Sequence, residues 1–132
     1  MRNLRTLSLI LLTALSAACT AGVSIGPENQ LEVTSAVDQF QFQLTALEGV
    51  TDTRSYDWEN TGAQATIDVS QSITGGSALI TIRDAAGATL YSSDAAEEND
   101  TTTDPGQPGM WRVTIDLVDV SGAFNFRAQK TT

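Results

Sequence analysis

The sequence predicts an all-β fold, an antiparallel two-sheet β-sandwich of about seven to eight strands that follows a signal peptide. Two observations support this class. Hydrophobic and polar residues alternate with a period of two along five separate segments, and no segment after the first 18 residues shows a helical period. A period of two places the hydrophobic residues on one face of a strand, so each sheet is expected to have one buried face and one wet face.

The alternating segments are residues 38–44, 65–70, 78–83, 111–117 and 124–128, and weaker strand patterns cover residues 31–37, 53–59 and 88–93. Their inward-facing residues are expected to be Phe40, Phe42, Ile67, Ile80, Ile82, Trp111, Val113, Ile115, Phe124 and Phe126. Turn residues separate the segments at positions 75–76, 84–87 and 121–122. The stretch from Asp84 to Gly87 fits a type I turn that ends in a left-handed glycine.

The first 18 residues have the layout of a secretory signal peptide. Arg2 and Arg5 precede the apolar run of residues 7–15, and small residues follow at 16–18. The run is too short to cross a bilayer, which takes about 20 residues. The sequence therefore predicts export, a short flexible tether over residues 19–30 and a β-sandwich domain over residues 31–130.

The segment Leu15-Ser16-Ala17-Ala18-Cys19 resembles the lipobox of bacterial lipoproteins. The resemblance implies that Cys19, the single cysteine, receives a lipid and becomes the first residue of a protein anchored in a membrane. Thr20 rather than an aspartate follows, which favours the outer membrane or cell surface over the inner membrane. The alternative is an ordinary signal peptide cut before Cys19 or after Ala21, which would leave no anchor.

The charge of the chain limits its partners. The sequence has 16 acidic and 7 basic residues and a formal net charge of −9. Such a chain repels the phosphates of nucleic acids and anionic headgroups. We therefore expect no nucleic-acid partner, and contact with a membrane only through the lipid anchor.

Residues 78–87, 90–91, 109–115 and 122–126 resemble small bacterial β-sandwich envelope lipoproteins of unassigned function, and more loosely the accessory sandwich domains found beside secreted peptidases. The shared features are structural: a strand, a D-x-x-G turn, a second strand, a long loop and a G-x-W start of the next strand. The resemblance implies a fold and an envelope location, and it carries no catalytic residue.

Few residues offer chemistry. The chain has no histidine, which excludes histidine-based triads and histidine metal ligands, so we expect a protein that is not an enzyme and needs no cofactor. A long acidic loop over residues 94–109 could instead supply oxygen ligands for Ca²⁺, although its spacing matches no EF-hand. The candidate ligands are Asp94, Glu97, Glu98, Asp100 and Asp104.

Tyr56 and Trp58 share one face of a predicted strand. Exposed aromatic rings there could contact a glycan or an envelope protein, whereas buried rings would belong to the core. The sequence thus predicts a non-catalytic cell-envelope lipoprotein that presents a small domain for binding or a structural role. The alternatives are a carbohydrate- or Ca²⁺-binding accessory module, or a carboxylate-dependent hydrolase with two facing acids in a cleft.

Overall fold

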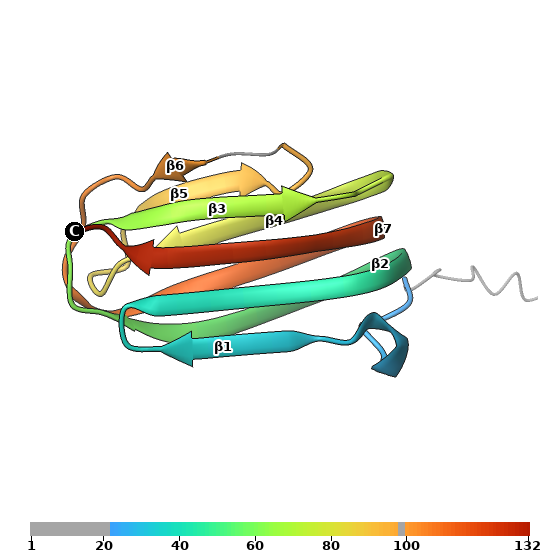
Figure 1. Cartoon of the computed structure of the whole chain (residues 1–132), viewed down its shortest axis with the longest axis horizontal. Helices are drawn as coiled ribbons and strands as arrows, with labels where there is room; N and C mark the ends of the chain where they lie inside the picture. Colours follow the sequence, from blue (N-terminus) through green and yellow to red (C-terminus); the bar gives the residue numbers. More distant parts are fainter. Residues whose placement is uncertain (1–21, 98–99) are drawn as a thin grey trace, which may run out of the picture.

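The computed structural model describes residues 22–97 and 100–132, which form one antiparallel sheet of seven strands (Figure 1). The elements are the 3-10 helix η1 (Pro27–Asn29) and the strands β1 (Glu32–Ala36), β2 (Gln39–Asn60), β3 (Ala65–Gln71), β4 (Gly75–Arg83), β5 (Thr89–Asp94), β6 (Thr101–Thr102) and β7 (Gly109–Lys130). The described residues include no helix that is long and apolar enough to cross a membrane. The all-β, antiparallel prediction is confirmed.

Two strands of 22 residues each, β2 and β7, determine the shape of the sheet. They pair from Gln39–Gln129 to Asn60–Gly109, with irregular register between Leu44 and Asp52. Left-handed backbone at Ala46 and Gly49 in β2, and at Asp119 and Gly122 in β7, marks the irregular stretch. Because β-bulges bend a strand and increase its twist, both strands turn here and the sheet folds over on itself (Figure 1).

The fold-over gives the sheet two halves that face each other. The first half contains β1, the start of β2, the end of β7, β3 and β6, and the second contains the end of β2, the start of β7, β4 and β5. Aromatic rings meet between the halves: the centroid of Phe40 lies 5.8 Å from that of Tyr56 and 6.3 Å from that of Trp58. The structure is therefore one curled sheet around one core, and two separate sheets are not confirmed because β2 and β7 run through both halves.

Every residue that the alternation places inward is buried. The confirmed set is Phe40, Phe42, Ile67, Ile80, Ile82, Trp111, Val113, Ile115, Phe124 and Phe126. Trp58 and Trp111 meet edge to face in the same core, with ring centroids 5.6 Å apart. The alternation in the sequence thus predicts the composition of the core, but not that one sheet supplies both of its walls.

The two halves are hydrogen-bonded to each other on both sides of the molecule, through β1 and the end of β2 on one side and through β5 and the loop after β6 on the other. On one side, the Trp58 Nε1 donates to the carbonyl of Ala36 at 2.9 Å, and the Ser35 hydroxyl donates to the carbonyl of Asp57 at 2.8 Å. On the other side, the Asp104 amide donates to the carbonyl of Leu90 at 3.1 Å. These bonds satisfy backbone groups that an open sheet edge would expose.

Residues 22–30, which the sequence assigns to a flexible tether, are attached to the bend of β2. Val23 pairs with Val50 in an isolated bridge, and the Thr51 amide donates to the Val23 carbonyl at 2.9 Å. Asn29 is only 1% exposed, and its Nδ2 donates to the carbonyls of Thr45 and Ala46. The folded domain therefore begins before residue 31.

Candidate functional site

The expected aromatic patch of Tyr56 and Trp58 is not on the surface. Trp58 is completely buried, and Tyr56 is partly buried with its ring 5.8–5.9 Å from those of Phe40 and Phe42. Burial raises the pKa of the Tyr56 hydroxyl. Of the two alternatives for these rings, exposed contact or core, the structure shows the core, because this face of β2 is turned inward after the bend, against the first half of the sheet.

The acidic residues proposed as Ca²⁺ ligands do not gather into a site. The Asp94 Oδ1 accepts hydrogen bonds from the amides of Ala78 and Ala96, which makes it a cap of the turn after β5. Among the described residues, no three acidic, cysteine or histidine side chains are arranged to hold a metal ion. Asp94, Glu97, Asp100 and Asp104 are thus not brought together, and Glu98 lies outside the described residues, as does Cys19.

Asp84, a buried carboxylate that is 6% exposed, is hydrogen-bonded to the end of the acidic loop. Its Oδ1 accepts from the amides of Ala86 and Ala88 at 3.0 and 2.8 Å, and its Oδ2 accepts from the Gln107 amide at 2.8 Å. The hydrogen bond from Gln107, followed by those from the turn amides, lowers the pKa of this carboxyl. Asp84 therefore ties the β4–β5 turn to the loop before β7, a structural role that its place in a D-x-x-G turn only partly indicates.

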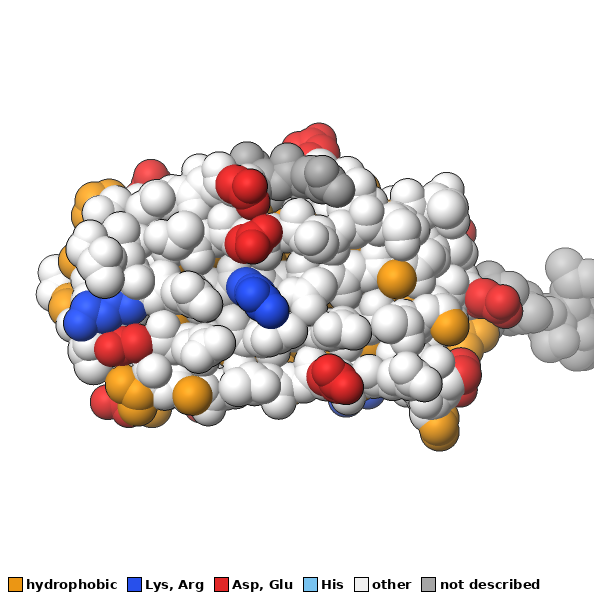
Figure 2. Space-filling model, in the orientation of Figure 1, with side chains coloured by type: hydrophobic (Ala, Val, Ile, Leu, Met, Phe, Trp, Pro, Cys, Tyr) orange, Lys and Arg blue, Asp and Glu red, His pale blue; other side chains and the backbone are white. Residues whose placement is uncertain are grey.

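The outer face of the first half of the sheet has an unusual composition. Its strands point mainly amide and hydroxyl side chains outward; the charged residues among them include Arg127 and Asp68, which lie opposite each other in register, and Glu32, which lies opposite Gln43. The uncharged polar set is Thr34, Gln39, Gln41, Gln43, Thr66, Ser70, Asn125 and Gln129. Figure 2 shows this face, where uncharged polar surface lies between small groups of acidic and basic side chains.

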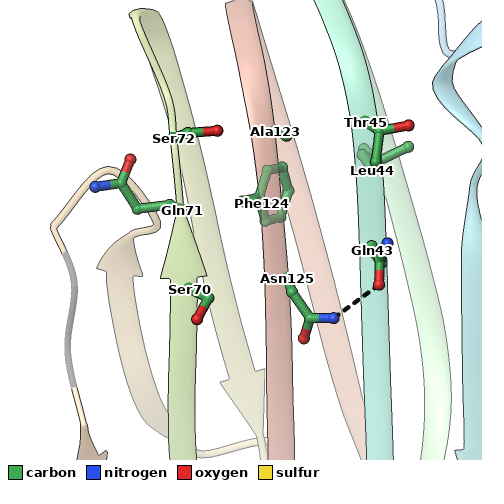
Figure 3. A pocket seen from close by; sticks show the side chains of 9 residues that line it. All are labelled: Gln43, Leu44, Thr45, Ser70, Gln71, Ser72, Ala123, Phe124 and Asn125. Carbon is green, nitrogen blue, oxygen red and sulfur yellow. Dashed lines mark hydrogen bonds between the residues drawn. The ribbon is translucent and has the colours of Figure 1, made fainter.

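A hollow of about 340 Å³ opens on this face near the bend of the sheet. We call it the polar hollow; it is lined by Gln43, Leu44, Thr45, Ser70, Gln71, Ser72, Ala123, Phe124 and Asn125 (Figure 3). It forms because the side chains of Ser70, Ser72 and Ala123 are shorter than those of the neighbouring Gln43 and Asn125. None of its lining residues is ionisable near neutral pH.

Two of the three side-chain amides that line the polar hollow, Gln43 and Asn125, are hydrogen-bonded to each other. The Asn125 Nδ2 donates to the Gln43 Oε1 at 2.9 Å, across a register pair of β2 and β7 (Figure 3). This bond fixes both side chains and directs the Gln43 Nε2 and the Asn125 Oδ1 away from the pair as a donor and an acceptor. Directly beneath, the rings of Phe42 and Phe124 stack with centroids 5.8 Å apart, so the floor is part of the packed core.

The polar hollow can donate and accept hydrogen bonds without bringing a charge to its ligand. The alternation of Gln39, Gln41 and Gln43 is visible in the sequence, but their alignment with Asn125 and Ser70 depends on a register between strands far apart in the chain.

The chain matches no family model, and a search of curated proteins found no match.

Proposed function

We propose that this chain is a non-catalytic lipoprotein of the bacterial cell envelope whose β-sandwich domain binds a neutral, hydroxyl-rich ligand, a glycan, in the polar hollow. The observation that carries the proposal is the lining of the hollow: amide and hydroxyl groups surround the apolar residues Leu44, Ala123 and Phe124, and no side chain in the lining is ionisable. A charged rim would favour an ionic ligand, whereas this one suits a ligand that is itself rich in neutral donors and acceptors.

The arrangement of Gln43 and Asn125 favours a ligand that has two neighbouring hydroxyl groups. The Gln43–Asn125 pair offers a donor and an acceptor in a fixed arrangement, and a fixed site loses little conformational entropy when it binds. The volume of about 340 Å³ lies at the lower end of the range for small-molecule sites, so the hollow suits a short part of a glycan. All four Phe and both Trp residues are buried, so affinity would come from hydrogen bonds rather than from ring stacking.

The proposed anchor would hold the polar hollow near a membrane. The first described residues lie at the bend end of the domain, while the C-terminus lies at the opposite end (Figure 1). Thr45 and Ala123 place the hollow near the same bend. Val23 follows Cys19 by four residues, which span at most about 14 Å when extended. A lipid on Cys19 would therefore keep the bend close to the bilayer surface, at the outer membrane or cell surface.

Calorimetric titration of the full-length protein with envelope glycans, including peptidoglycan fragments, tests the proposal. We expect weak, saturable binding that Asn125→Ala reduces and that Ala123→Phe, which fills the hollow, abolishes. Ser92→Ala, an exposed hydroxyl change on the other half of the sheet, serves as the control and should bind normally.

Equal binding by all three variants would refute the proposed site. Turnover of a glycan by the wild type, lost on replacing a single carboxylate, would instead support the hydrolase alternative.

A further inference from the structure

The second half of the sheet carries two arginines directly opposite each other on its outer face. Arg83 of β4 is the register partner of Arg112 of β7, and both side chains are exposed. Directly opposed residues have Cβ atoms about 4.5–5.5 Å apart, so two like charges in this arrangement repel each other. The repulsion between the two arginines is unfavourable, and it occurs in a chain that has only 7 basic residues against 16 acidic ones.

The other described cations lie beside acids. Arg54 is 3.1 Å from Asp52 and Lys130 is 3.8 Å from Asp38, while Arg127 lies opposite Asp68 in register. Arg112 also has an acidic partner, Asp57, in an exposed ion pair, whereas the one described hydrogen bond of Arg83 is to a backbone carbonyl, and both contacts are long. The Arg83 Nη1 is 3.5 Å from the Gly87 carbonyl, and the Arg112 Nη1 is 3.5 Å from the Asp57 Oδ1.

A guanidinium has five N–H donors, so most of the donors of this pair face solvent. Hydroxyls lie in the adjacent row on the same face: Thr81 opposes Thr114, which in turn opposes Ser55. Asp57 opposes Arg112 on the side away from Arg83, and Glu59 lies two residues further along β2. The space between Arg83 and Arg112 therefore has a guanidinium on each side.

We infer that Arg83 and Arg112 form a binding site for a small phosphate-class oxyanion, separate from the polar hollow and on the other half of the sheet. Two guanidinium forks can each bind two oxygens of a tetrahedral anion, and the anion removes the repulsion between them. The acidity of the whole chain opposes approach to a polyanionic surface, so the ligand is a small phosphate or phosphate monoester rather than an anionic bilayer.

Titration of the full-length protein with inorganic phosphate, followed by calorimetry and by amide NMR at constant ionic strength with chloride as the reference salt, tests the inference. We expect saturable binding with shifts confined to residues near Arg83 and Arg112. Arg83→Gln or Arg112→Gln should weaken binding by about tenfold or more, since each removes a charged fork. Asp57→Asn should tighten it, because the carboxylate competes for Arg112.

The matched control is Arg127→Gln, an exposed arginine on the first half of the sheet, which should bind phosphate normally. Circular dichroism of each variant verifies that it is folded. Glycerol phosphate should bind like inorganic phosphate. The inference is overturned if chloride reproduces the shifts, if Arg127→Gln loses as much affinity as Arg83→Gln, or if phosphatidylglycerol vesicles bind while both soluble phosphates do not. None of these results depends on glycan binding.

Discussion

Replacing Trp58 by alanine tests how completely the curled sheet encloses its core. The side chain has no exposed surface, its ring contacts those of Trp111 and Phe40, and its Nε1 donates to the Ala36 carbonyl. Truncation of a buried tryptophan costs about 3–5 kcal/mol, and the lost hydrogen bond adds about 1 kcal/mol. Because whole domains are stable by about 5–15 kcal/mol, Trp58→Ala should remove a large part of the stability and unfold the protein at room temperature only if its stability lies at the low end of that range.

Trp58→Phe separates the two contributions, since it keeps an aromatic ring and removes the N–H. We expect a loss of about 1–2 kcal/mol, and each kcal/mol lowers the melting temperature of a domain of this size by about 4–8 °C. Urea and thermal unfolding followed by far-UV circular dichroism measure both variants. Leu79→Ala, at a position that is 42% exposed, is the control and should change little. If Trp58→Ala melted like the parent, Trp58 would not be enclosed and the fold-over of the sheet would be wrong.

Four further predictions concern other parts of the chain. Asp84 has a lowered pKa, so its contribution to stability is complete at neutral pH and disappears as pH falls through the ordinary aspartate value of 3.8 and below. Asp84→Asn should therefore unfold more easily at pH 7 and lose stability less steeply in acid titrations followed by circular dichroism. Gly122→Ala should destabilise the protein more than Gly87→Ala in urea melts. Both glycines have positive φ, which costs alanine about 1–2 kcal/mol, but only at Gly122 would the new Cβ strike backbone, that of Ser72. Calcium at millimolar concentration should leave the melting temperature unchanged, and a rise of several degrees that Asp100→Ala and Asp104→Ala abolish would show that the acidic loop binds it. Cys19→Ala should abolish labelling by a radioactive fatty acid and release the protein from the membrane fraction; an unlabelled wild type would disprove the anchor.

Local alternation was sufficient to predict ten of the buried residues, because the side-chain period of a strand is a property of consecutive residues, but it did not predict the burial of Trp58, Leu47 or Val50. Phe40 and Phe42 lie on one face of their strand whatever strands surround it, and in this sheet that face is buried. The Asp84–Gly87 turn was predictable too: the Gly87 amide donates to the Asp84 carbonyl, and Gly87 has a φ of +86°.

The bends were not predictable from alternation. Residues 111–117 and 124–128 looked like two strands with a turn at Ser121-Gly122, yet both belong to β7. The phase of alternation is interrupted where Asp119 and Gly122 adopt positive φ, and a bulge and a turn give the same interruption in sequence. The same ambiguity at Ala46 concealed the fold-over that turns Trp58 inward.

The polar hollow could not be predicted because its residues come from three strands. Gln43, Asn125 and Ser70 become neighbours only through the registers of β2 with β7 and of β3 with β7. Long-range register depends on the bulges in β2 and β7, so an outward polar residue in the sequence gave no indication of which other residues would surround it.

The most direct test of the proposed binding surface is amide NMR mapping of the full-length protein during titration with a neutral envelope glycan. We expect saturable shifts concentrated at Gln43, Ala123 and Asn125, with the signals of Arg83 and Arg112 unchanged. Shifts centred on any other surface, or no shifts up to the solubility limit of the glycan, would rule out glycan binding in the polar hollow.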